Sequence, residues 1–277
     1  MSSDYRKQNA VRRWQSGGRA SGPPAAAGPR FDPERVELFG LHAVQAALAN
    51  PARPIHELHL TENAERRLGT ALAGRELAVT RTSPRDLDRR LGPDTVHQGI
   101  LLVTAALPEP SFEDMTEAAH AGRPLIVLDQ VTDPHNVGAI LRSAAVFGAG
   151  GLIMTRRHSP PPTGTLAKSA SGALEIVPIH LTQNLARALA GLREAGIEVV
   201  GLAGDADAAI EDHGFDKPVA LVLGAEGKGL RQSTAEGCAM LCRIHAGAEL
   251  DSLNVSNAAA VALHMVAFRR RQARSGP

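Results

Sequence analysis

Three short segments in the second half of the chain place polar side chains beside glycines or other small residues. They are residues 133–143, 223–230 and 250–258, and each begins at or just after the end of an apolar run. Small residues let the backbone approach a ligand closely while a few polar groups are aimed at it. Three such segments in order predict one composite site rather than three separate ones.

The first segment offers an amide and a guanidinium. Asn136 lies where a helix is expected to begin, so its side chain either caps that helix or binds a ligand at the helix's positive end. Arg142 follows six residues later, in the expected second turn. A planar guanidinium there can grip phosphate through two hydrogen bonds, and a surface ion pair is the alternative interpretation.

The other two segments offer a carboxylate, a hydroxyl and an amide. Glu226 stands among the glycines of residues 224–229, whose spacing fits neither a nucleotide-hydrolase phosphate loop nor a dinucleotide fingerprint. Its carboxylate either binds ribose or an ammonium group, or is simply solvated. Ser252 and Asn254 precede a long predicted helix, where they act as caps or as ligands.

The elements around these segments alternate in type. The pattern predicts helices over residues 137–147, 185–195 and 255–273, and strands over residues 125–128, 151–154, 176–179, 199–202 and 219–223. Continuous apolar strands that alternate with helices predict a parallel sheet covered on both faces. Ligands of such sheets bind beyond the carboxyl ends of the strands, which is where the three segments lie.

A smaller α/β domain is predicted over residues 36–105. A helix over 41–48 and strands over 57–60 and 99–104 fit the apolar pattern. Another helix is expected at Pro84, with Ser83 as its cap.

The remaining segments are interpreted as connections. Residues 1–35 are rich in Gly, Pro, Ala and Arg without an apolar period, which predicts a disordered basic arm. Residues 106–121 form a linker that includes a short amphipathic helix. Four arginines near the C-terminus add a second basic end. Basic ends on a chain of net charge +1 fit either a polyanionic partner or a tail that aids solubility.

Composition excludes several other classes of protein. At 277 residues and 43% hydrophobic content the chain can bury real cores, and 3% aromatic residues argue against a surface that stacks many bases. Cys238 and Cys242, four apart in an expected helical turn, lack a metal-ligand cluster and are predicted to be free thiols. No apolar run approaches the roughly 20 residues that cross a bilayer, and no signal core is present. We therefore expect a cytoplasmic protein with no membrane partner.

Together the three segments resemble the signature motifs of the SpoU (TrmH) family of S-adenosylmethionine-dependent RNA ribose 2′-O-methyltransferases, over roughly residues 122–272. The preceding domain is similar to the small RNA-binding substrate domain of the branch that methylates 23S ribosomal RNA. Residues 39–44 resemble the usual opening of that domain. The resemblance implies a C-terminal methyltransferase domain over residues 122–277. Its parallel sheet would be tied into a trefoil knot, an exception to the rule against threaded loops.

The resemblance also implies roles for single residues. Gly224, Ile244 and Leu253 would line the S-adenosylmethionine pocket, and no metal is required. Family members are usually homodimers with the active site near the subunit interface. The residues that would form the reaction centre are Asn136, Arg142, Glu226, Ser252 and Asn254.

One departure from the family pattern follows Ile244, where the family usually has Pro-Met and this chain has His245 and Ala246. Without the proline's fixed φ the loop is less restrained. His245 is either a substituted loop residue or a catalytic base.

The chemistry required of such a site can be stated independently. A ribose hydroxyl is a poor nucleophile, so the protein must align oxygen, methyl and sulfur and help to remove one proton. A guanidinium has a pKa above about 12, so we favour a role for Arg142 in gripping phosphate and stabilising the alkoxide. A direct role for Arg142 as base is the competing hypothesis.

These observations predict methyl transfer to a ribose 2′-hydroxyl of structured RNA, with a guanosine of 23S ribosomal RNA favoured over transfer RNA. A transfer-RNA guanosine 2′-O-methyltransferase of the same family is the near alternative. A non-catalytic RNA-binding factor in ribosome assembly is the alternative from another class.

Overall fold

The structure is a computed structural model of the 277-residue chain, and it describes residues 32–72, 77–245 and 253–275. Most of the predicted basic arm of residues 1–35 lies outside the described residues, and so does Ser252. The remaining site residues all fall within the described ranges.

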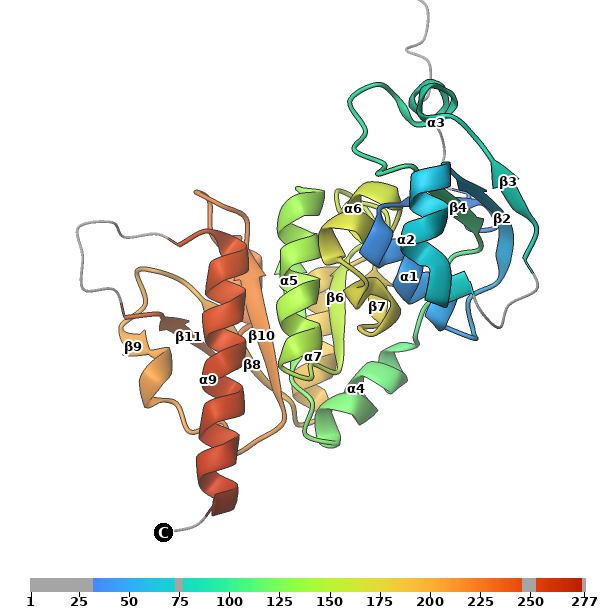
Figure 1. The fold of residues 1–277 in the computed structure, drawn as a ribbon. Helices are drawn as coiled ribbons and strands as arrows, with labels where there is room; N and C mark the ends of the chain where they lie inside the picture. Colours follow the sequence, from blue (N-terminus) through green and yellow to red (C-terminus); the bar gives the residue numbers. More distant parts are fainter. Residues whose placement is uncertain (1–31, 73–76, 246–252, 276–277) are drawn as a thin grey trace, which may run out of the picture. The chain divides into compact units, whose positions relative to one another are not determined.

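The first part of the chain forms a four-stranded sheet in the order β1-β4-β2-β3 (Figure 1). The central strand β4 is buried at every residue and pairs antiparallel with β1 and β2. Ser83 Oγ accepts a hydrogen bond from Asp86 N at 3.3 Å, which confirms the predicted cap. The elements are β1 (Val36–Phe39), α1 (Leu41–Ala49), β2 (Ile55–Leu60), α2 (Glu62–Leu72), β3 (Val79–Arg81), α3 (Pro84–Leu91) and β4 (Ile100–Thr104).

The rest of the chain forms a seven-stranded sheet in the order β7-β6-β5-β10-β8-β11-β9. Every described pair of neighbouring strands in it is parallel, which confirms the predicted parallel sheet. The strands are β5 (Leu125–Asp129), β6 (Gly151–Thr155), β7 (Ile179–Thr182), β8 (Glu198–Leu202), β9 (Ala208–Ala209), β10 (Val219–Gly224) and β11 (Met240–Arg243).

Helices cover both faces of this sheet, because successive strand residues point to opposite sides. Ile126 and Leu128 of β5 join the core under α5 and α9, whereas Leu125 and Val127 join the core under α4 and α7. The helices are α4 (Phe112–His120), α5 (Pro134–Val146), α6 (Gly164–Ala170), α7 (Leu185–Glu194), α8 (Gln232–Gly237) and α9 (Val255–Ser275), with the 3₁₀ turns η1 (Ala173–Glu175) and η2 (Ile210–Asp212).

Strand β10 lies between β5 and β8, which both precede it in the chain. Its last residue, Gly224, stands opposite Asp129 at the end of β5. This register brings the second polar segment next to the start of the first. The trefoil knot stays a prediction, because residues 246–252 lie outside the described part of the chain.

Two predicted element boundaries were wrong. Helix α5 begins at Pro134 rather than Val137, and Asp133 is its cap, so Arg142 lies in the third turn and not the second. Strand β7 begins at Ile179 rather than Ile176, whose side chain is 63% exposed. In both cases a proline beside the apolar run shifts the element, since proline favours the first helical turn and cannot donate to a strand ladder.

Two other expectations also need correction. Cys238 and Cys242 do not share a helical turn, because Cys238 follows α8 and Cys242 lies in β11; both are free thiols, as predicted. Two of the four C-terminal arginines are bound to the body of the protein rather than part of a solvated tail. Arg269 and Arg270 lie on α9 and donate to backbone oxygens, Arg269 to Glu211 and Arg270 to residues 122 and 217.

Candidate active site

The loop after β10 is a tight turn that only small residues permit. A Cβ on Gly224 would lie 2.1 Å from the carbonyl carbon of Gly229, and Gly229 N donates to Ala225 O at 2.9 Å. Gly227 and Gly229 both have positive φ, which favours glycine. The loop therefore presents backbone groups, with Glu226 exposed on it.

A buried carboxylate at the end of β5 holds the far end of this loop. Asp129 is 1% exposed and accepts hydrogen bonds from Arg231 N at 3.0 Å and from Arg231 Nε at 2.7 Å. These bonds fix the loop of residues 225–231 over the carboxyl end of β5. Sequence reasoning missed this pair, although an acidic residue closing an apolar strand was a signal that it had a partner.

Three of the predicted reaction-centre residues meet beside this loop. Asn136 Nδ2 donates to Glu226 Oε1 at 3.1 Å, and Asn254 Nδ2 donates to Asn136 Oδ1 at 3.0 Å. Asn254 Nδ2 also donates to Glu226 Oε1. Among the described residues no group donates to Glu226 Oε2, so that oxygen remains available to a hydroxyl or ammonium group. We call these three residues the amide–carboxylate cluster.

The amino ends of two helices orient the cluster. Asp133, not Asn136, caps α5 by accepting from His135 N at 2.9 Å, so the capping interpretation of Asn136 was wrong. Asn254 does cap α9, because its Oδ1 accepts from Ser256 N at 2.9 Å, and its Nδ2 serves the cluster as well. Helix amino ends carry partial positive charge, so both helices place that charge near Glu226.

Arg142 does not join the cluster. It is exposed on α5, and its side chain makes no hydrogen bond or ion pair with another described residue. Its position is on the same side of the helix as Val146, four residues on, whose side chain is 78% exposed. Arg142 is therefore an exposed residue beside an exposed apolar side chain.

Two of the predicted cofactor residues, Gly224 and Ile244, lie at the ends of β10 and β11, which are separated in the sheet by β8. Ile244 directly follows β11 and is half-buried against the core, whereas Leu253 is 49% exposed just before α9. His245 donates its backbone N–H to Glu211 Oε1 at 3.1 Å. His245, at the position where the family usually has proline, thus makes a hydrogen bond through a backbone N–H that proline lacks.

The described residues contain no group of three or more His, Cys, Asp or Glu side chains that could hold a metal ion. None of the described helices is long and apolar enough to cross a membrane. Burial raises the pKa of the Cys238 thiol to about 11 and also raises that of Cys242. Neither thiol is therefore an activated nucleophile near neutral pH.

Two family models match the chain, and together they cover both sheets. The SpoU rRNA Methylase family matches residues 123–264, which is more than half of the chain. The chain belongs to the SpoU rRNA methylase family. The model for RNA 2′-O ribose methyltransferase substrate binding matches residues 38–110, where the four-stranded sheet lies.

Full-length relatives carry one name. The chain is 40% identical over 230 residues to the 23S rRNA (guanosine-2′-O-)-methyltransferase RlmB of Ralstonia nicotianae, covering 82% of this chain and 92% of the relative. It is 38% identical over 240 residues to the protein of the same name from Shewanella oneidensis, covering 84% and 97%.

Solved structures share the fold. The SpoU methyltransferase AviRb from Streptomyces viridochromogenes, in complex with the cofactor AdoMet, aligns with a TM-score of 0.71 at 22% identity, covering 86% of this chain and 91% of that one. An AdoMet-bound rRNA methyltransferase from Sinorhizobium meliloti aligns with a TM-score of 0.69 at 24% identity, covering 86% and 88%. These alignments support the α/β architecture, including the small sheet before the parallel one.

Proposed function

We propose that this chain transfers the methyl group of S-adenosylmethionine to the 2′-hydroxyl of a guanosine in 23S ribosomal RNA. Membership of the SpoU family and the shared name of its full-length relatives support the reaction and the substrate. The observation that carries the proposal is the amide–carboxylate cluster, because three separate segments bring Asn136, Glu226 and Asn254 into hydrogen-bond contact at one strand edge.

The residues present fit S-adenosylmethionine. The turn after Gly224 offers backbone groups at Gly227 and Gly229, and Leu253 offers an exposed apolar side chain just before α9. We propose that Gly224, Ile244 and Leu253 hold the cofactor at this place. The sulfonium of the cofactor would supply an already activated methyl group. Ser252 stays a proposed member of the reaction centre.

In this mechanism the cluster orients the ribose, and Arg142 interacts with the negative charges of the phosphate and of the 2′-oxygen. Glu226 Oε2 accepts a hydrogen bond from a ribose hydroxyl, while Asn136 and Asn254 keep the carboxylate fixed. Because Arg142 does not join the cluster of its own chain, Arg142 of the partner subunit in the homodimer proposed below grips an RNA phosphate and stabilises negative charge on the 2′-oxygen as the hydroxyl proton passes to water. Holding the hydroxyl in line with the methyl group supplies the rest of the acceleration.

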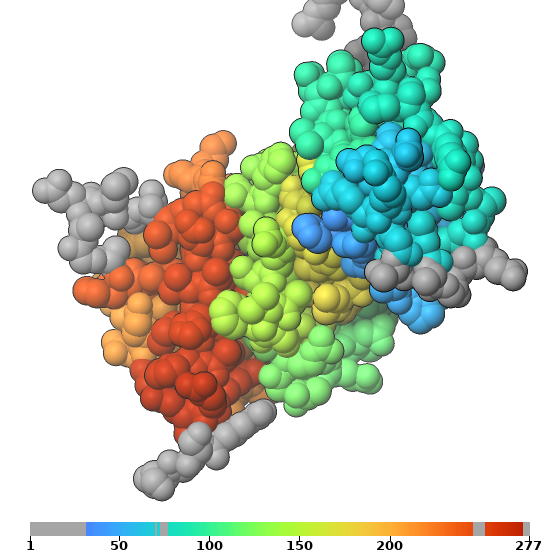
Figure 2. Space-filling model, viewed as in Figure 1, coloured from blue at the N-terminus to red at the C-terminus, as the bar shows by residue number. Residues whose placement is uncertain are grey.

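We also propose a homodimer that uses an apolar patch on α5 and α9, which lie side by side (Figure 2). Val146, Val261 and Phe268 are exposed there, and His264 stacks on Phe268. Contiguous exposed apolar surface marks interaction sites. Because Arg142 borders this patch, pairing would place it beside the second subunit. A Phe268→Asp variant should sediment as a monomer.

The two parts of the chain then divide the work, and we propose residues 36–105 as the RNA-binding domain, 106–121 as the linker and 122–277 as the knotted methyltransferase domain. We place the protein in the cytoplasm with its substrate. The basic arm of residues 1–35 would add salt-sensitive affinity through counterion release. Its deletion should weaken RNA binding and flatten the salt dependence while leaving cofactor affinity unchanged.

The test is to incubate the protein with S-adenosylmethionine labelled in its methyl group and with separate pools of unmodified ribosomal and transfer RNA. Label in 23S ribosomal RNA alone is the expected result. Label in transfer RNA alone would replace the substrate by the near alternative. No label together with no measurable cofactor binding would favour a non-catalytic assembly factor.

A further inference from the structure

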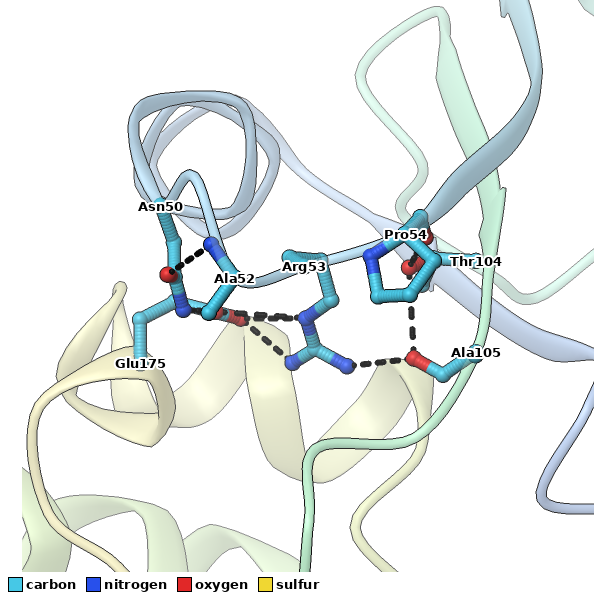
Figure 3. A network of polar contacts seen from close by, with 7 residues as sticks. All are labelled: Asn50, Ala52, Arg53, Pro54, Thr104, Ala105 and Glu175. Carbon is cyan, nitrogen blue, oxygen red and sulfur yellow. Dashed lines mark hydrogen bonds and ion pairs between the residues drawn. The ribbon is translucent and has the colours of Figure 1, made fainter.

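A buried ion pair joins the two sheets. Arg53 lies in the turn between α1 and β2, Glu175 lies in η1, and their side chains are 1% and 6% exposed. Arg53 Nη2 donates to Glu175 Oε1 at 2.5 Å, and Arg53 Nε lies 3.2 Å from both carboxylate oxygens. Figure 3 shows the pair between the turn that carries Arg53 and the segment that carries Glu175.

The surroundings complete the hydrogen bonding of both groups. Asn50 Nδ2 donates to Glu175 Oε2 at 2.8 Å, and Arg53 Nη1 donates to Ala105 O at 2.8 Å, at the start of the predicted linker (Figure 3). Apolar side chains of similar size would hold two surfaces together at least as firmly, since burying two charges is costly. The directional hydrogen bonds of this ion pair instead fix one geometry between the two surfaces. We call the ion pair and its hydrogen bonds the Arg53–Glu175 clasp.

The segment that carries Glu175 fits closely against the small sheet at two other points. A Cβ on Gly164, the first residue of α6, would lie 2.2 Å from Phe39 Cε1. A Cβ on Gly172, which has φ +94°, would lie 2.8 Å from Ala46 Cβ. Contacts this close leave no room for sliding, so α6 and η1 follow the position of β1 and α1.

The opposite side of α6 fits equally closely against the helix that begins the active site. A Cβ on Gly138 in α5 would lie 2.4 Å from Ser169 Cβ. Ser169 Oγ and His135 Nδ1 are 3.1 Å apart, within hydrogen-bond distance. These two contacts bracket Asn136, which lies between His135 and Gly138 in the sequence. The helix α6 therefore connects the small sheet to a member of the amide–carboxylate cluster without an intervening loop.

We infer that Arg53 and Glu175 are positioning residues for methyl transfer: their clasp fixes the small sheet against α6, and α6 fixes α5 and Asn136. The inference rests on the proposed function. RNA held by the small sheet then presents its target ribose to the cluster at a set distance. Loosening the clasp leaves both binding surfaces intact but disturbs their mutual placement, and a misplacement of about 1 Å can cost roughly 100-fold in rate.

The experiment uses the full chain with Arg53→Met and Glu175→Met combined, because two apolar side chains of similar length keep the interface packed without an unpaired charge. The control combines Glu198→Gln and His213→Gln, which removes a partly buried pair within the large sheet at the amino end of β8. Thermal unfolding, S-adenosylmethionine affinity by calorimetry, and kcat and KM for ribosomal RNA are measured for each protein.

The clasp variant should unfold cooperatively and bind cofactor within about twofold of wild type, while kcat falls at least about tenfold and KM for RNA changes little. The control should leave kcat unchanged. A clasp variant with wild-type kcat would overturn the inference and leave the pair a purely structural one. If the double variant fails to fold, Arg53→Lys gives the same decision, because it keeps both charges but loses the hydrogen bonds that the guanidinium makes through Nε and to Ala105 O.

A wild-type protein that binds cofactor but methylates no RNA would refute the proposed function, and the inference would fall with it. A wild-type protein that methylates RNA, together with an equally active clasp variant, would refute the inference alone.

Discussion

Two polar clusters in this protein join segments that are far apart in the sequence, yet they differ in exposure. The amide–carboxylate cluster of Asn136, Glu226 and Asn254 lies at strand and helix ends, with its hydrogen bonds open to solvent. The Arg53–Glu175 clasp is buried between two sheets. The difference predicts different consequences of substitution. Substitutions in and around the exposed cluster should lower the rate of methyl transfer more than the free energy of unfolding. Removing one partner of the clasp alone should lower the free energy of unfolding.

The largest effect is expected at Arg142, on the exposed side of this comparison. Arg142→Ala should lower kcat by about 10²–10³-fold, the usual loss when a group that stabilises transition-state charge is removed. The unfolding temperature should not change, because the Arg142 side chain is exposed and makes no hydrogen bond or ion pair with another described residue. Steady-state methyl transfer and thermal unfolding test both statements. Arg142→Lys with near-normal turnover would contradict a two-pronged phosphate grip.

On the buried side, Arg53→Met alone should lower the free energy of unfolding by about 3 kcal/mol, because it leaves the Glu175 carboxylate buried without its cation. Urea unfolding of the single and double variants measures this. The double variant with Glu175→Met should recover most of the loss. A single variant as stable as wild type would show that the pair is not held in a buried state in solution.

Asn254 separates capping from chemistry within one side chain. Asn254→Ala should cost about 1 kcal/mol of stability through the lost cap of α9. Asn254→Asp keeps the oxygen that accepts from Ser256 N but replaces the donor to Glu226 by a second carboxylate. It should therefore keep the stability and lose methyl transfer by about tenfold. Wild-type activity of Asn254→Asp would mean that the donation to Glu226 is unimportant.

The last prediction concerns the partly buried thiol of Cys238, for which no effect on methyl transfer is expected. The pKa of Cys238 is raised from 9.0 to about 11 by burial, so at pH 8 its alkylation should be about 100-fold slower than that of an ordinary thiol. Because the folded pKa is the higher one, the stabilising contribution is present below about pH 9 and is lost as the pH rises towards 11. Iodoacetamide labelling of folded and urea-unfolded protein measures the first effect, and rapid labelling of the folded protein would contradict it.

The sequence predicted the parallel sheet and the meeting of the polar segments because those features follow from local pattern. Four buried apolar runs and a fifth, partly buried one alternate with helices, and each polar segment follows a strand end. Helix α2 was missed because, of its residues whose burial the structure describes, only Ala64 and Leu68 are fully buried, which is too weak an apolar period to recognise. Strand β11 was missed because Cys238 and Cys242 have helical spacing.

Contacts between distant residues could not be predicted. Arg53 and Glu175 are 122 residues apart, and nothing near either one in the sequence indicates the other. The same holds for Asp129 and Arg231, which are 102 residues apart. Even in the site, sequence reasoning named Asn136 and Glu226 but not the bond between them, because that bond depends on β10 entering the sheet beside β5.

The most direct test of the central claim is the chemical position of the transferred methyl group. Ribosomal RNA labelled by this protein is digested with alkali, which cannot cleave the bond next to a 2′-O-methylated ribose. If the protein methylates the 2′-hydroxyl of a guanosine, the label survives in an alkali-resistant dinucleotide that begins with guanosine. Label released in mononucleotides would place the methyl group on a base and contradict ribose 2′-O-methylation.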